Sequence, residues 1–364
     1  MRRPRATDVE VDRSHDYGYC NARIRGMWSH LLDRGSLEQL VDAETLDAQI
    51  RYLSGTPYKA DIEEALIYGH TVASVDRALR ANVGRTWLVV LKILPEQGVG
   101  LVKAVLANWD IFDLKTILRG AHTQLSQAEI IDSLMPAATL SAAELSELAA
   151  AGSVRSVVDT LATWRMPYSR PLDAALPEYH RNGELAPLEL ALDRWYYSSV
   201  AARLQHRHDA GKRLVASVVG TMVDIENLRT AFRLIGAELT TAAIAEYWLE
   251  GGAHISQPSF VSLCEAADIE GILNAMRRTP YAKTLEAAAV TYLQEGSLSV
   301  LERALENLTT REVLAARRLD PLGVGVVVAF LWAKQNEVSN IRIAVTGRSV
   351  GLPEERMRRE LILV

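Results

Sequence analysis

The sequence has 364 residues, of which 49% are hydrophobic and 23% charged, and its formal net charge at neutral pH is −5. This balance is typical of a globular protein with a substantial core and excludes a disordered chain. General nucleic-acid binders usually have a basic surplus, so nothing in this composition indicates one. The two cysteines, Cys20 and Cys264, are too few for a disulfide framework or a zinc signature.

The chain begins with a basic stretch, residues 1–5, which continues into acidic residues and not into the apolar segment of a signal peptide. We expect residues 1–16 to form a flexible N-terminal arm. The longest apolar run, 322–333, ends at Lys334. A membrane-crossing helix needs roughly 20 apolar residues, so the sequence predicts no transmembrane segment, and any link to a membrane would go through a partner protein.

The predicted elements after the arm are helices that recur in the same order three times. An amphipathic stretch comes first in each set, at 46–53, 154–161 and 269–276. A Pro-Tyr pair follows, with its proline at positions 57, 167 and 280, so the pairs lie 110 and 113 residues apart. A similar helix start comes after each pair. Prolines at 167, 171, 177 and 187 predict a loop over 167–187, and residues 87–91 have strand propensity but continue as helix.

A second landmark recurs later in each set, in segments 109–119, 223–233 and 336–346, which are 114 and 113 residues apart. Its pattern is acid, branched aliphatic, any residue, Asp or Asn, Leu or Ile, Lys or Arg. Apolar residues upstream and on one face predict one long helix per set. Glycines follow these segments at 120, 236 and 347 and suit left-handed helix caps.

Two landmarks in one order at one period indicate a tandem triplication, with copies at 17–122, 123–236 and 237–350 and a C-terminal tail at 351–364. A repeat of this size is a small domain, not a solenoid unit. The fold class predicted is all-α, with three similar helical domains in a pseudo-threefold funnel.

The sequence offers no support for catalysis. No Gly-rich loop ends in Gly-Lys-Ser/Thr, because Gly98 and Gly100 lack the following Lys-Ser/Thr, so we expect no nucleotide hydrolysis. We predict no catalytic residue, cofactor, metal or small-molecule ligand. One alternative is an enzyme with a metal near His206 and His208, but residues two apart on a helix point to different faces.

The charged and amide residues of the second landmark are the candidate site. Two interpretations stay open: they contact something inserted on the axis, or they form hydrogen bonds and ion pairs between helices within their own copy. The late basic position is absent from the third copy, where Thr346 replaces it. The candidate residues are Asp113, Lys115, Arg119, Asn227, Arg229, Arg233, Asn340 and Arg342.

The sequence resembles the AC39 family, which contains the C and d subunits of rotary V/A-type ATPases. The resemblance is carried, in order along most of the chain, by the opening motif and by both internal signatures and the C-terminal motifs. These are residues 17–27, 109–115, 223–232, 320–325, 337–342 and 351–353.

The resemblance implies a non-catalytic rotor subunit, monomeric by itself and peripheral on the cytoplasmic face of a membrane. Its implied partners are the central stalk subunits and the membrane proteolipid ring, so that ATP synthesis or hydrolysis is linked to proton or sodium transport. The alternative from another class is a soluble helical-repeat scaffold that binds an unrelated protein partner.

Overall fold

The computed structural model describes residues 16–135, 140–204 and 209–363. All regular secondary structure in these ranges is helical, so the predicted all-α fold class is confirmed. The predicted N-terminal arm lies outside the described residues except for Asp16.

The first group of helices is α1 (Gly18–Trp28), α2 (Arg34–Asp42), α3 (Leu46–Leu53), α4 (Lys59–Ala65), the 3-10 turn η2 (Leu66–Tyr68) and α5 (Val72–Ile93). The second group is α6 (Glu96–His122), α7 (Gln127–Ser133), α8 (Ala142–Ala149), α9 (Val154–Thr163), α10 (Ser169–Asn182) and α11 (Ala186–Arg203). The third group is α12 (Ala210–Leu234), α13 (Thr241–Ala245), α14 (Gln257–Cys264), α15 (Ile269–Met276), α16 (Ala282–Glu295) and α17 (Leu298–Leu319). The chain closes with α18 (Val324–Ser349) and α19 (Glu354–Glu360).

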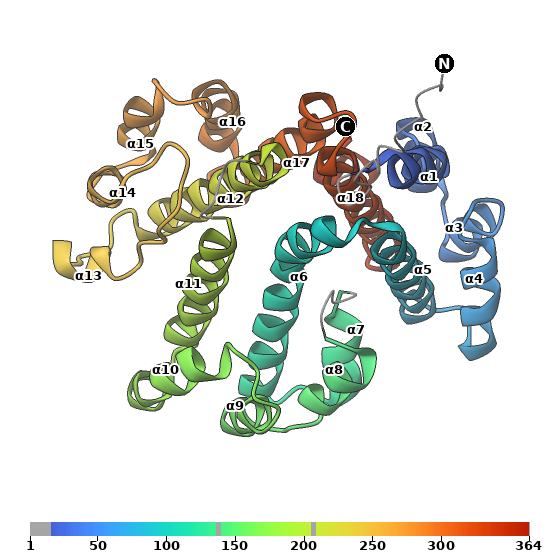
Figure 1. Cartoon of the computed structure of the whole chain (residues 1–364), viewed down its shortest axis with the longest axis horizontal. Helices are drawn as coiled ribbons and strands as arrows, with labels where there is room; N and C mark the ends of the chain where they lie inside the picture. The colour runs from blue at the N-terminus through green and yellow to red at the C-terminus, as the bar shows by residue number, and fades with distance from the viewer. Residues whose placement is uncertain (1–15, 136–139, 205–208, 364) are drawn as a thin grey trace, which may run out of the picture.

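These helices form three lobes around a common centre, as Figure 1 shows. Lobe I contains α1–α5 with α18 and α19, lobe II contains α6–α11, and lobe III contains α12–α17. Matching helix pairs pack in each lobe: α18 with α5, α6 with α11, and α12 with α17. Helix α17 also packs along α18 and so joins lobe III to lobe I.

Lobes II and III therefore begin with their long helix, whereas lobe I takes its long helix from near the C-terminal end of the chain. The predicted copies 17–122, 123–236 and 237–350 each end with a long helix instead. Packing and sequence repetition thus divide the chain at different points, and the copy boundaries stay a prediction.

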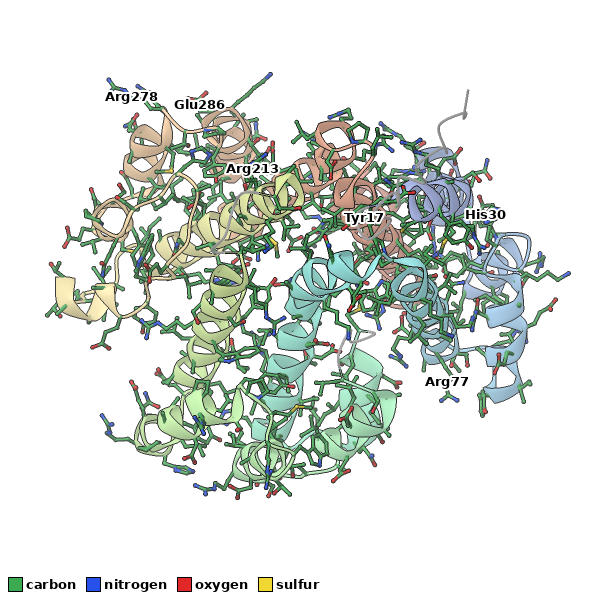
Figure 2. The ribbon with its side chains drawn as sticks, viewed as in Figure 1. Tyr17, His30, Arg77, Arg213, Arg278 and Glu286 are labelled. Atoms are coloured by element: carbon green, nitrogen blue, oxygen red, sulfur yellow. The ribbon has the colours of Figure 1, made fainter. Side chains whose placement is uncertain are left out.

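The N-terminal ends of the three long helices meet at the centre. A Cβ placed on Gly211 of α12 would lie 3.2 Å from Val324 at the start of α18 and 3.5 Å from Leu101 of α6. Tyr17, labelled near the centre of Figure 2, packs on Gly98 of α6. Burial, with Asp209 among its neighbours, raises the pKa of Tyr17 to about 12, so its phenol stays neutral in this junction.

Two local predictions are wrong. The predicted loop 167–187 holds α10 and the start of α11, because Pro171 and Pro187 stand in first turns, where the backbone N–H has no helical partner. Gly120 and Gly347 lie inside α6 and α18 and are not caps. The left-handed conformation is confirmed for Gly236, with φ of +75°, and residues 87–91 are helical as predicted.

Candidate axial interface

The long helices α6, α12 and α18 line an open cavity of about 410 Å³, and α11 and α17 complete its wall. Two sets of positions that correspond in the predicted repeat face it from all three long helices. The first set is Asn108, Met222 and Gln335, and the second is Phe112, Glu226 and Ser339. The cavity therefore lies where a pseudo-threefold axis would pass.

The second of these sets is the variable position of the sequence pattern. Phe112 is 46% exposed and offers an aromatic ring, whereas Glu226 offers a carboxylate and Ser339 a hydroxyl. The position before it is a core position in two of the helices, because Ile111 and Val338 are 3% and 0% exposed and neither lines the cavity. The pattern is thus repeated where the helices pack and varies where they face the cavity.

The early basic residue of each signature makes an ion pair inside its lobe. The ion pair joins the long helix to α11 in lobe II, to α17 in lobe III and to α5 in lobe I. The pairs are Lys115–Asp193 at 2.6 Å, Arg229–Glu306 at 3.3 Å and Arg342–Asp76 at 2.8 Å. Each partner lies in the next sequence copy, with the third returning to the first, and not in the same copy as the second interpretation supposed.

These ion pairs are partly buried, and burial affects their protonation. Burial raises the pKa of Asp193 to about 6, although Lys115 opposes the shift. Arg229 and Arg342 also line the cavity, so each of these two residues both makes an ion pair and forms part of the cavity wall.

The late basic residues also make ion pairs inside their lobe, in lobes II and III. Arg119 binds both carboxylate oxygens of Glu189 at 2.7 Å, and Arg233 binds Glu302 with its closest contact at 2.6 Å. Lobe I has Thr346 at this position, so a full ring of three basic residues is excluded.

The Asp or Asn of each signature is buried and holds a backbone segment of its own lobe. Asp113, Asn227 and Asn340 are 0%, 0% and 1% exposed, and none of them lines the cavity. Each accepts a hydrogen bond from the backbone N–H 22 residues downstream, at Met135, Leu249 and Ile362 respectively. These three contacts, called the clamps below, attach the segment after α7, α13 or α19 to the long helix.

In two of the lobes the two landmarks touch each other, a contact that the sequence does not predict. In lobe III the Tyr281 hydroxyl donates to Asp224 at 2.7 Å. In lobe I the Tyr58 hydroxyl donates to Glu337, and Lys334 Nζ lies 2.8 Å from both groups. Asp224 and Glu337 are the first acids of their signatures. In lobes I and III the tyrosine of the Pro-Tyr pair thus binds the acid of the long helix in its lobe.

The described residues contain no group of three or more His, Cys, Asp and Glu side chains that would hold a metal ion. His206 and His208 lie outside the described residues. Among the helices that the structure describes, none is long and apolar enough to cross a bilayer.

Comparison with known proteins gives one consistent result. A family model described as ATP synthase (C/AC39) subunit matches residues 20–360. The C subunit of the A-type ATP synthase of Methanothermobacter thermautotrophicus is 29% identical over 347 residues, covering 95% of this chain and 87% of the relative. Its counterpart in Methanococcoides burtonii is 29% identical over 350 residues, covering 96% and 95%. That of Methanosarcina acetivorans is 28% identical over 361 residues, covering 99% and 96%.

Proposed function

Because the chain belongs to the ATP synthase (C/AC39) subunit family, we propose that it is the non-catalytic rotor subunit of a V/A-type ATPase or ATP synthase. It receives the end of the central stalk and rests on the cytoplasmic side of the membrane proteolipid ring. ATP synthesis or hydrolysis is thereby linked to proton or sodium transport. By itself the protein is a monomer, and its place at the membrane is peripheral.

The observation that supports this proposal is the cavity between the three long helices. A cavity of about 410 Å³ that opens between three lobes suits the insertion of a helical end. Its wall offers apolar contact from Trp109, Phe112 and Trp332 together with charged groups from Arg229 and Arg342. An apolar centre with a polar rim is the usual composition of a specific protein interface.

The three long helices place different residues at equivalent positions of the cavity wall, and this difference is consistent with a subunit that transmits torque. A wall with identical residues on all three helices would accept an inserted stalk in three equivalent orientations, and the stalk would slip between them. Phe112, Glu226 and Ser339 stand at equivalent positions but differ in size and charge. Such differences favour one orientation over the other two, since specificity is a difference between binding free energies.

A binding experiment with the full chain tests the role. Phe112→Arg places a charge in the wall of the cavity at a side chain that is already 46% exposed, so the fold should survive. We expect this variant to lose co-purification with the central stalk subunits. Leu293→Arg is the matched control, because Leu293 is 82% exposed on α16 and is not part of the cavity wall. Equal stalk binding by both variants would contradict the axial site, and capture of other proteins without ATPase subunits would favour the scaffold alternative.

A further inference from the structure

The three clamps are alike in position but unequal in chemistry. Asn227 accepts from Leu249 N at 3.1 Å and donates to Leu249 O at 2.9 Å. Asn340 accepts from Ile362 N and donates to Ile362 O, both at 2.9 Å. Two lobes therefore hold one residue by both of its backbone groups.

The third clamp has an aspartate where the others have an amide. Asp113 accepts from Met135 N at 2.8 Å through Oδ1, which reproduces the first bond of the other clamps. Its second oxygen, Oδ2, is buried and has no hydrogen-bond partner among the described residues. This atom corresponds to the amide nitrogen that donates to the carbonyl in lobes I and III. A carboxylate has no proton to donate, whereas a neutral carboxylic acid has one.

We propose that Asp113 is held as the neutral carboxylic acid and that its Oδ2–H donates to the carbonyl oxygen of Met135, so that lobe II has the same two-bond clamp as the other lobes. The aspartate then acts as an isostere of asparagine. Unlike asparagine, it loses the second bond when its proton leaves.

The surroundings of Asp113 support the neutral form. Burial is the largest influence and raises the pKa of Asp113 to about 8, with Asp110 of the same helix adding to the effect. Arg342 of α18 and Arg80 of α5 face it and oppose the shift, as does the bond from Met135 N. Both guanidinium groups already bind other partners: Arg342 binds Asp76 and the Leu134 carbonyl, and Arg80 binds backbone carbonyls of α7.

The position makes this clamp a pH-sensitive joint between lobes I and II. The carbonyl of Leu134, next to Met135, accepts the bond from Arg342 that joins lobe I to lobe II. Removal of the proton would set a charged oxygen beside the Met135 carbonyl and weaken that attachment. The clamps of the other two lobes carry amides and do not titrate, so lobe II alone responds through this contact.

Asp113→Asn tests the proposal because it keeps the shape and supplies the donor permanently. A carboxyl group whose pKa is raised by folding stabilises most at low pH, and that contribution falls as the pH rises toward the folded pKa. We therefore expect the melting temperature of the variant to exceed that of the parent chain by a margin that widens from about pH 4, the unfolded-state pKa, to about pH 8 and then stays constant. If Asp113 were instead ionised and held by Arg342 and Arg80, the difference in melting temperature would have the opposite sign, and the variant would be less stable than the parent chain at neutral pH.

Asn227→Asp is the reciprocal variant and should create a similar pH dependence in lobe III. Infrared spectra of the full chain give a second, independent measurement. Subtracting the neutral-pH spectrum of Asp113→Asn from that of the parent should leave the carbonyl band of a protonated carboxylic acid. The subtraction removes other buried acids such as Asp193. A carboxylate band in its place would overturn the proposal, even if the stability data were complicated by partial unfolding.

Discussion

The hydroxyl of the repeated tyrosine has a different environment in each lobe. Tyr58 and Tyr281 bind acids of the long helices, and both side chains are buried. The Tyr168 hydroxyl is buried in lobe II without a hydrogen-bond partner in the part of the chain that the structure describes. Since a buried polar group is stabilising only when it is hydrogen-bonded, the same residue should contribute differently in the three lobes.

The first prediction compares these tyrosines by removing one oxygen at a time. Tyr58→Phe leaves Lys334 and Glu337 buried with a lost partner, so the free energy of unfolding should fall by about 1–3 kcal/mol. Tyr168→Phe removes a hydroxyl that bonds to none of the described residues, so stability should be unchanged or slightly higher. Chemical denaturation of both variants measures the difference. A larger loss for Tyr168→Phe would show that its hydroxyl has a partner after all.

Sequence spacing locates the signature residues but not their partners. Asp113, Asn227 and Asn340 stand out because polar residues recur at the same place in an apolar helix. Their partners are backbone groups 22 residues later, and any residue type supplies a backbone C=O and, proline aside, an N–H. The acids Asp76 and Glu306 also leave no clear signal, because acidic residues are common on exposed helix faces. Only the packing of the helices selects them.

At the scale of single helices, glycines in the long helices allow a close approach of the next short helix. A Cβ on Gly120 would lie 2.4 Å from Ile130 Cγ1 of α7, and one on Gly347 would lie 2.7 Å from Met357 Sδ of α19. In sequence, such a glycine looks like a helix end, because glycine is common just after the last helical turn. A glycine inside these helices differs from one at a helix end only because a neighbouring helix occupies the space that a side chain would fill.

The second prediction uses two glycines that are both inside helices. Gly120→Ala should lower the free energy of unfolding by about 1–3 kcal/mol, because the methyl group overlaps a branched side chain close to its backbone. Gly84→Ala in α5 should raise it by about 0.5–1 kcal/mol, because no described atom beyond the adjoining residues and backbone of α5 would lie within 4 Å of the new methyl group, and alanine favours the helix. Thermal unfolding of the pair distinguishes contact from helix propensity. Stabilisation by both changes would mean that α7 moves away without cost.

The helices themselves follow from the sequence better than their grouping does. Periodic apolar residues and the capping serines Ser126 and Ser141 mark α7 and α8 locally. Prolines misled the interpretation of α10, since Pro177 stands inside that helix. Nothing in the sequence indicates that α18 belongs to lobe I. A long helix with two apolar faces can pack equally well on helices that precede it or on helices that follow it in the chain.

For the whole molecule, the C-terminal segment should stabilise the N-terminal lobe. Helix α19 packs on α2 and α18, and Met357 is fully buried there. A chain ending at residue 352 loses these contacts and the Asn340 clamp. We expect faster hydrogen exchange in α2 and α3 and little change in α9. Arg359 also pairs with Glu295 of lobe III, but exposed ion pairs contribute little. Exchange that increased mainly in α14–α16 would contradict this assignment of the tail to lobe I.

The return of α18 to lobe I has a consequence for how the protein is made. Domains usually fold from the N-terminus onward as the ribosome delivers them. Lobes II and III are continuous in sequence, so each is complete once α11 or α17 has emerged. Helices α1–α5 emerge first, yet their partner begins only at Val324. Side chains such as Ile24 and Tyr58 are fully buried in the folded protein, but they lack the packing partner α18 through most of translation. The lobe that is synthesised first is therefore the last to fold, and it is the part of the nascent chain that chaperones would need to protect.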